Sequence, residues 1–323
     1  MSTFLVTGAA GFIGLNQCEY LLSLGHKVIG IDNFITSHKP IYQPVIERLE
    51  KDNFDFYRID LENYVDLLWI FNNYQIDYVV HLAAIPSIPR SINNPTQVLE
   101  NNIISTMNIL ELSRQYEIKK FVYASSSSYY GGICHIGQPL DNRAPHCKSP
   151  YAASKGAGEL LVNSYFHSFC LPTTILRYFN VFGQYQNPES EYSAVIPIFI
   201  NKILNDEQPI IYGDGKQSRD FTHVDNVVYA NYLSSISDTM GNILDIGCGS
   251  DINLIGLVQI INKIIGKNIS PIFDAPRYSD VSFSLAHIKS ACDEIKYQVQ
   301  TSLYKGLEKT IEYYKNVKEE KYE

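Results

Sequence analysis

The stretch TFLVTGAAGFIG, residues 3–14, decides the fold of this chain. A short apolar run leads into three glycines at G-x-x-G-x-x-G spacing, and an amphipathic run then continues to Leu24 and ends at Gly25. The order strand, glycine turn, helix is typical of the first unit of a dinucleotide-binding fold. Gly8 permits the tight turn, Gly11 lets the backbone approach a pyrophosphate, and Gly14 lets the helix pack closely on the strand.

A second apolar strand, residues 27–31, ends at Asp32, which lies 18 residues after Gly14. An acidic residue at this place binds the adenosine ribose hydroxyls, and its charge repels a 2′-phosphate. The pattern therefore favours NAD over NADP. The alternative is that Asp32 is only a helix cap or a turn residue.

Composition limits the function classes. The chain has 323 residues, of which 45% are hydrophobic, and its net charge is −8. No basic stripe indicates nucleic acid, and no apolar run is long enough to span a membrane. The six cysteines show no C-x-x-C pair, so we expect a reduced cytoplasmic protein. The pairs Cys134-His135 and His146-Cys147 do not have the common zinc spacing, so we expect no metal site.

Two further strands are predicted to bring their carboxyl ends to the same edge. Residues 54–59 end at Asp60-Leu61, which could contact an adenine, although Asp60 could equally cap the next helix. Residues 77–83 lead into the small residues Ala83 and Ala84, which would let a ligand lie against the backbone. His81 sits inside this apolar strand, and we expect it to be a core histidine rather than a catalytic one.

The most informative pair is Tyr151 and Lys155. They follow a serine cluster at residues 125–128, which ends the strand 119–124, and they lie at i and i+4 of a helix expected over 150–169. A free tyrosine titrates near ~10. A lysine ammonium one turn away, together with a cationic nicotinamide, would lower the pKa of Tyr151 and stabilise its phenolate. Such a phenolate can take the proton of an alcohol while a hydride leaves to NAD⁺.

At this point the chain resembles the extended short-chain dehydrogenase/reductases, and within them the nucleotide-sugar 4-epimerases. The resemblance runs over nearly the whole chain and rests on a series of motifs in order. These are TGAAGFIG, DNF (32–34), HLAA (81–84), the serine cluster, Y-x-x-x-K, LRYFNVFG (176–183), GDGKQSRDF (213–221) and PRYSD (276–280).

The resemblance implies a role for each matching residue. Ser126 is the catalytic hydroxyl, Tyr151 the base and Lys155 its partner. The implied cofactor contacts are Gly8, Gly11, Phe12, Ile13, Gly14, Asp32, Asn33, Asp60, Leu61, Ala83, Ala84, Asn102, Tyr151, Lys155 and Tyr178. The implied substrate contacts are Ser87, Ser126, Ser127, Ser128, Asn180, Gln186, Ala194, Val195, Tyr212, Arg219, Arg277, Asp280 and Ser284.

Two features refine the expected substrate. Related 4,6-dehydratases carry Asp and Glu where this chain has Ser127 and Ser128, so the acid/base pair for water elimination is missing. The closest pattern is the UDP-N-acetylglucosamine 4-epimerase branch. There, Ser284 aligns with a position near C2 of the sugar, and a serine leaves room for an N-acetyl group.

These observations predict an α/β fold with a Rossmann-type doubly wound parallel sheet and a smaller C-terminal substrate domain. We expect residues 1–180 plus 225–250 to bind NAD, and residues 181–224 plus 251–323 to bind a UDP-sugar. The expected reaction interconverts UDP-GlcNAc and UDP-GalNAc through a 4-keto intermediate, in a cytoplasmic homodimer with the helices 95–116 and 151–169 at its interface. The alternatives are a UDP-glucuronate 4-epimerase, for which Arg90 is the candidate cation, a UDP-glucose/galactose 4-epimerase, and an inactive NAD-binding scaffold.

Overall fold

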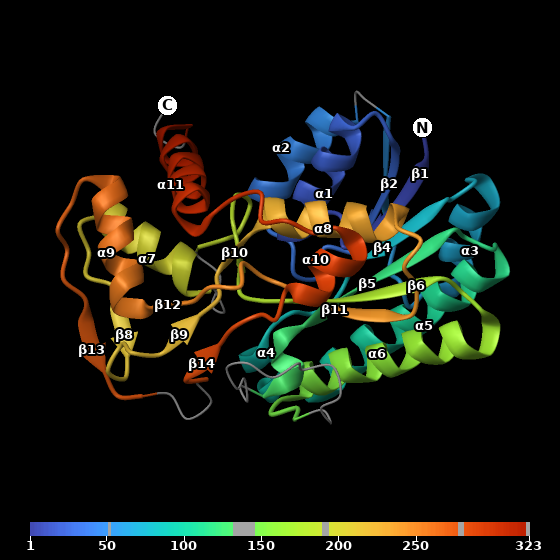
Figure 1. Cartoon of the computed structure of the whole chain (residues 1–323). Coiled ribbons are helices and arrows are strands. Elements are labelled where there is room, and N and C mark those ends of the chain that lie inside the picture. Colours follow the sequence, from blue (N-terminus) through green and yellow to red (C-terminus); the bar gives the residue numbers. More distant parts are fainter. Residues whose placement is uncertain (51–52, 132–145, 189–193, 277–280, 321–323) are drawn as a thin grey trace.

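The computed structural model describes residues 1–50, 53–131, 146–188, 194–276 and 281–320 (Figure 1). At its centre is a seven-stranded parallel sheet in the order β11-β6-β5-β4-β1-β2-β3. The strands are β1 (Thr3–Thr7), β2 (Lys27–Asp32), β3 (Phe54–Arg58), β4 (Tyr78–His81), β5 (Lys120–Ser126), β6 (Thr173–Tyr178) and β11 (Asn242–Ile246). The predicted Rossmann-type sheet is thereby confirmed.

Helices cover both faces of this sheet because successive strand residues point to opposite sides. Leu5 of β1 belongs to a core with α3 (Tyr64–Asn73), α5 (Pro95–Gln115) and α6 (Pro150–Phe169). Its neighbours Phe4 and Val6 belong to a core on the other face with α1 (Phe12–Ser23) and α2 (Lys39–Leu49). Figure 1 shows α8 (Val224–Ile236) on this second side, where it packs on α1.

A second, smaller core lies beyond one end of the sheet, at the left of Figure 1. It joins α7 (Val195–Leu204), α9 (Leu254–Ile265) and α11 (Leu303–Glu320). The short strands around it are β7 (Val181–Phe182), β8 (Ile210–Tyr212), β9 (Ser218–Arg219), β10 (Thr222–His223), β12 (Ile252–Asn253), β13 (Ile272–Asp274) and β14 (Phe283–Ser284). They pair as β10-β7, β12-β9-β14 and β13-β8.

The helix α10 (Lys289–Ile295) departs from this second group. Its Ala291 and Ile295 pack against Leu244 and Ile246 of β11, at the edge of the large sheet. The chain therefore returns to the large sheet after β14, within the range that the sequence assigns to the substrate half. The division into two units remains a prediction.

Strand order reverses at β1, whose neighbours are β2 and β4. In open parallel sheets the carboxyl ends of such neighbouring strands diverge and leave a crevice for ligands. The loops after β1, β2, β4 and β5 all open at this edge.

Candidate active site

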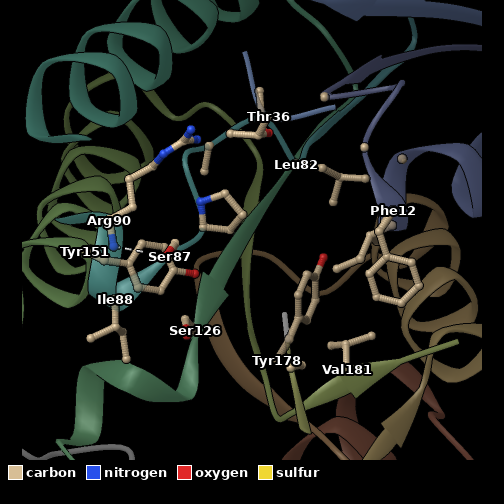
Figure 2. Close-up of a pocket in the computed structure, with 18 of the residues that line it drawn as sticks. Phe12, Thr36, Leu82, Ser87, Ile88, Arg90, Ser126, Tyr151, Tyr178 and Val181 are labelled. Atoms are coloured by element: carbon tan, nitrogen blue, oxygen red, sulfur yellow. Dashed lines mark hydrogen bonds between the residues drawn. The ribbon is translucent and has the colours of Figure 1, made fainter. Parts of the chain in front are cut away.

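A cavity of about 860 Å³ occupies this edge of the sheet. Figure 2 shows Ser87, Ser126 and Tyr151 on one side of it and Phe12, Tyr178 and Val181 on the other. Most of the residues predicted for the cofactor and the substrate line it together. These are Gly8, Gly11, Phe12, Ile13, Gly14, Asp32, Asn33, Leu61, Ala83, Ala84, Ser87, Ser126, Ser127, Ser128, Tyr151, Tyr178, Asn180, Gln186, Ala194, Arg219 and Ser284.

The glycine loop fits a pyrophosphate. Gly8 has a φ of 70°, and a Cβ on it would lie 2.8 Å from the backbone nitrogen of Ala83. A Cβ on Gly14 would overlap with the carbonyl oxygen of Gly8. The helix α1 starts after Gly11, which offers no capping side chain. The N–H groups of its first turn therefore face the cavity as an anion site.

Asp32 forms hydrogen bonds with both the glycine loop and the loop that follows β2. Its carboxylate accepts hydrogen bonds from the N–H of Ala10 at 3.0 Å and of Phe34 at 2.7 Å, and from the hydroxyl of Ser37 at 3.3 Å. Burial raises the pKa of this carboxyl, while the three bonds lower it. Asp32 thus serves as a turn residue in the structure, and it also lines the cavity.

Three of the expected cofactor residues do not line the cavity, namely Asp60, Asn102 and Lys155. Asp60 is exposed and accepts a hydrogen bond from Asn33 at 3.0 Å. The alternative that Asp60 caps α3 is wrong, because the N-cap is Asn63. Leu61, which follows Asp60, is buried and does reach the cavity.

Asn102 lies behind the cavity wall and stabilises it by hydrogen bonds. It is buried, accepts from the N–H of Ile85 at 2.8 Å and donates to the hydroxyl of Ser154 at 2.9 Å. It thereby fixes the loop after β4 against α6. Its neighbour Asn101 and Ser105, one turn further along α5, line the cavity instead.

Ser126 and Tyr151 meet at the end of β5. Ser149 caps α6 and places Tyr151 in its first turn, where the hydroxyl is hydrogen-bonded to Ser126. Ser128 donates a second hydrogen bond to the hydroxyl of Ser126 at 2.9 Å. Ser127 and Ser128 lie in the short 3-10 helix η1 (Ser127–Tyr130).

Burial and hydrogen bonding shift the pKa of Tyr151 in opposite directions, and its activation by Lys155 and a cationic nicotinamide stays a prediction. Burial raises the pKa of Tyr151, and the hydrogen bond with Ser126 lowers it in part. Lys155 is buried and donates to the carbonyl oxygen of Ala124 at 2.7 Å. Burial lowers the pKa of Lys155 to about 8. This bond holds the ammonium group of Lys155 at the backbone of β5.

His81 is the core histidine that the sequence predicts. It is buried between the hydroxyls of Thr7 at 2.8 Å and Thr106 at 3.1 Å. Burial lowers its pKa to about 3. It therefore stays neutral at physiological pH.

The substrate side is organised by Asp220, which the sequence analysis did not single out. Its buried carboxylate accepts from the N–H groups of Cys248, Gly249 and Ala286. Its carbonyl accepts from the amide of Asn180 at 3.0 Å. These bonds bring Asn180, β9 and β14 together, so that Arg219 and Ser284 become register partners in a parallel pair.

Gln186 also lines this part of the cavity. Its side chain donates to the carbonyl of Val181 at 3.4 Å, and its amide oxygen is buried without a hydrogen-bond partner among the described residues. An unsatisfied buried acceptor is costly, which makes it a candidate ligand contact.

Two expected substrate contacts lie elsewhere in the structure, and two others are not described. Val195 and Tyr212 do not line the cavity, because Ala194 reaches it from the end of α7 and Tyr212 lies in the outlying strand β8. Arg277 and Asp280 are outside the described residues, as are Cys134 and His135. Among the residues that the structure describes, no helix is long and apolar enough to cross a membrane, and no group of three or more His, Cys, Asp or Glu could hold a metal ion.

The cavity also contains residues that the sequence analysis missed. Thr36, Ser37 and His38 follow shortly after Asp32 and line the cavity. Because they are polar and close to the predicted ribose-binding Asp32, the sequence could have predicted them as cofactor contacts. Tyr185 gave no such signal. It has a φ of 68° and is held by a hydrogen bond from its hydroxyl to Glu19 at 3.0 Å, which only the tertiary structure creates.

Comparison with known proteins identifies the family of this chain. Residues 4–247 match the model of the NAD dependent epimerase/dehydratase family. The chain is 34% identical over 322 residues to a UDP-glucuronate 4-epimerase of Thermodesulfobacterium geofontis, covering 98% of this chain and 97% of that protein. The chain belongs to the NAD dependent epimerase/dehydratase family, and it is an enzyme whose cofactor is NAD.

Two solved structures are similar over almost their whole length. The UDP-N-acetylglucosamine 4-epimerase from Methanobrevibacter ruminantium M1, in complex with UDP-N-acetylmuramic acid, has a TM-score of 0.90 at 33% identity and covers 98% of this chain and 99% of its own. The UDP-glucuronic acid 4-epimerase from Bacillus cereus, in complex with UDP-glucuronic acid and NAD, has a TM-score of 0.88 at 32% identity with the same coverage.

Proposed function

We propose that this protein is an NAD-dependent UDP-sugar 4-epimerase. The observation that carries the proposal is the hydrogen-bonded pair of Tyr151 and Ser126 in the same cavity as the glycine loop. A base and its orienting hydroxyl therefore face the space next to a dinucleotide site.

The reaction follows from this arrangement. Tyr151, as phenolate, takes the proton of the sugar 4-hydroxyl, and Ser126 holds the same oxygen by a hydrogen bond. When bound, NAD would supply the acceptor for the C4 hydride, the donor that gives it back, and a positive charge near the phenol. Since burial keeps the pKa of Tyr151 high in the protein alone, we expect the phenolate to form only in the loaded enzyme. The 4-keto sugar turns over in the cavity, so that the hydride returns to the opposite face of C4. Tyr151 gives its proton back to the C4 oxygen, and this yields the inverted alcohol.

We propose UDP-GlcNAc and UDP-GalNAc as the substrate pair. Ser284 is small, buried and on the cavity wall, so it leaves room for an N-acetyl group at C2. Ser127 and Ser128 supply hydroxyls where elimination of water needs an acid and a base. The similarity to a UDP-N-acetylglucosamine 4-epimerase supports this choice.

The second candidate is a UDP-hexuronate. Arg90, in α4 (Ile88–Asn93), lines the cavity on the side of Ser87 and Tyr151 (Figure 2). Within the described part of the chain its guanidinium has no ion-pair partner, so it could bind a carboxylate. The similarity to UDP-glucuronate 4-epimerases supports this alternative.

The remaining features of the proposal are structural. We assign the UDP half of the substrate to residues 181–224 and 251–323, with Asn180 and Arg219 at the junction. We also propose a homodimer formed through α5 and α6, in the cytoplasm.

The test is a substrate panel. Purified protein is incubated with UDP-GlcNAc, UDP-Glc and UDP-GlcA separately, without added reductant, and the 4-epimers are resolved by NMR. We expect conversion of UDP-GlcNAc and slower conversion of UDP-Glc. Conversion of UDP-GlcA alone would replace our substrate by the hexuronate and direct attention to Arg90.

Tyr151→Phe is the matched test of the mechanism. We expect turnover to fall by a factor of about 10³, with NAD still bound. The control is Tyr116→Phe, which removes an exposed phenol outside the cavity. Turnover retained in Tyr151→Phe would remove Tyr151 as the base.

A further inference from the structure

Three successive turns of α6 face the last three residues of β5. Tyr151 is hydrogen-bonded to Ser126, and Lys155 donates to the carbonyl oxygen of Ala124. One turn further, Glu159 accepts a hydrogen bond from the hydroxyl of Ser125. Residues at i, i+4 and i+8 share a helix face, so one helix edge binds the end of this strand residue by residue.

Glu159 is itself held by an ion pair with Arg177, a residue to which the sequence analysis gave no role. Arg177 of β6 donates to both carboxylate oxygens, at 2.8 and 2.5 Å, and both side chains of this pair are 4% exposed. Arg177 also donates to the hydroxyl of Tyr130 at 2.7 Å, and that hydroxyl donates to Asp245 at 2.7 Å. Removing one partner of such a pair leaves a buried charge uncompensated.

We propose that Glu159 is a positioning residue of the epimerase reaction: it holds the end of β5 so that Ser126 meets Tyr151, and it places a negative charge on the helix face that carries Lys155. This inference rests on the proposed function. The bidentate Arg177 fixes Glu159, and Glu159 in turn fixes Ser125, the residue next to Ser126.

The charges around Lys155 determine the direction of its titration. His81 of β4 faces it and is neutral because its pKa lies near 3. The ring of Tyr123 of β5 lies 5.1 Å from the ammonium. On α6 itself the neighbours are Tyr151 and Glu159, and Arg177 of β6 lies behind Glu159. Burial lowers the pKa of Lys155, and Glu159 raises it.

Glu159→Gln therefore has a signed consequence. The amide still accepts from Ser125, but the negative charge is lost and Arg177 remains. The pKa of Lys155 falls further below about 8, so the lysine loses its proton at a lower pH. We expect the basic limb of the kcat–pH profile to move to lower pH by about one unit. We also expect kcat at pH 8 to fall about fivefold, because the protonated fraction of Lys155 there drops from about a half to about a tenth.

The experiment measures kcat and KM against pH for the NAD-loaded wild type, Glu159→Gln and Glu159→Asp. The aspartate variant keeps the charge, so its basic limb should stay with that of the wild type. Titration of Lys155 by ¹⁵N NMR gives the same shift without relying on turnover. The control is Glu111→Gln, which breaks another bidentate glutamate–arginine pair that is partly exposed on α5.

The outcomes separate this inference from the proposed function. A wild type that converts no UDP-sugar contradicts the proposed function. An active wild type whose profile and Lys155 titration are matched by those of Glu159→Gln overturns the positioning role. If Glu159→Gln does not fold, Ser125→Ala tests the other half: an unchanged kcat overturns the role, and a lower kcat with an unmoved basic limb supports it.

Discussion

The glycine loop on the cofactor side of the cavity is built from one continuous segment, whereas the substrate side is assembled from distant ones. Residues 8–14 form the turn and the start of α1 at the end of a single buried strand. Asn180, Arg219 and Ser284 come from three segments, and the buried Asp220 brings them together. The first arrangement depends on backbone shape, and the second depends on a carboxylate that bonds several loops.

The largest expected effect breaks the cofactor side alone. Gly14→Ala places a methyl group into the carbonyl of Gly8, where backbone cannot yield easily. We expect the free energy of unfolding to fall by about 3 kcal/mol, measured by urea denaturation, with loss of NAD binding.

The matched control for this variant is Gly25→Ala. A Cβ on Gly25 meets nothing within 4 Å, although its φ of 77° is strained for alanine. It should cost only about 1 kcal/mol and keep NAD bound. Equal losses in the two variants would show that close packing at Gly14 is not what the cofactor side depends on.

The second prediction breaks the substrate side. Asp220→Asn replaces a carboxylate that accepts three backbone N–H groups by an amide that directs its own N–H groups at some of them. We expect a loss of about 2 kcal/mol in stability and a raised KM for the UDP-sugar with unchanged NAD affinity. Asp206→Asn, on an exposed residue that pairs with Lys267, is the control.

The same residue gives a pH dependence with a defined sign. Burial raises the pKa of Asp220 to about 6, from 3.8. The folded state therefore holds this proton more tightly than the unfolded state, and its contribution to stability is full below about pH 4 and is lost as the pH rises through about 6. In Asp220→Asn this component should be missing from the stability–pH curve. An unchanged curve would mean that Asp220 does not carry it.

The smallest effect sharpens the comparison within the substrate side. Ser284→Leu fills space on the cavity wall without touching the glycine loop. We expect the preference for UDP-GlcNAc over UDP-Glc to fall about tenfold, as steric exclusion of one substituent permits. Competition assays with the two sugars measure it, and NAD affinity should not change. An unaltered preference would place the N-acetyl group elsewhere.

The fold could be predicted from the sequence because the patterns that indicate it lie within short segments. The first five strands of the parallel sheet follow from apolar runs and the glycine spacing, and His81 was recognised as a core residue from the strand around it. Site residues could be predicted where they belong to a recognisable motif, as Tyr151 and Ser126 do. The roles of Asp220 and Glu159 could not be predicted, because their hydrogen-bond partners are distant in sequence.

The sequence by itself determined the Rossmann-type sheet, the glycine loop and the tyrosine–lysine pair, since each depends on neighbours within a few residues. Only the tertiary structure decided that Asn102 and Lys155 lie behind the cavity wall. It also decided that the carboxylate of Asp32 accepts a hydrogen bond from Ala10 of the glycine loop. Only the tertiary structure placed Arg177 against Glu159. The physical reason is that burial and hydrogen-bond partners set the direction in which a side chain points and titrates, and these come from segments that the chain brings together only on folding.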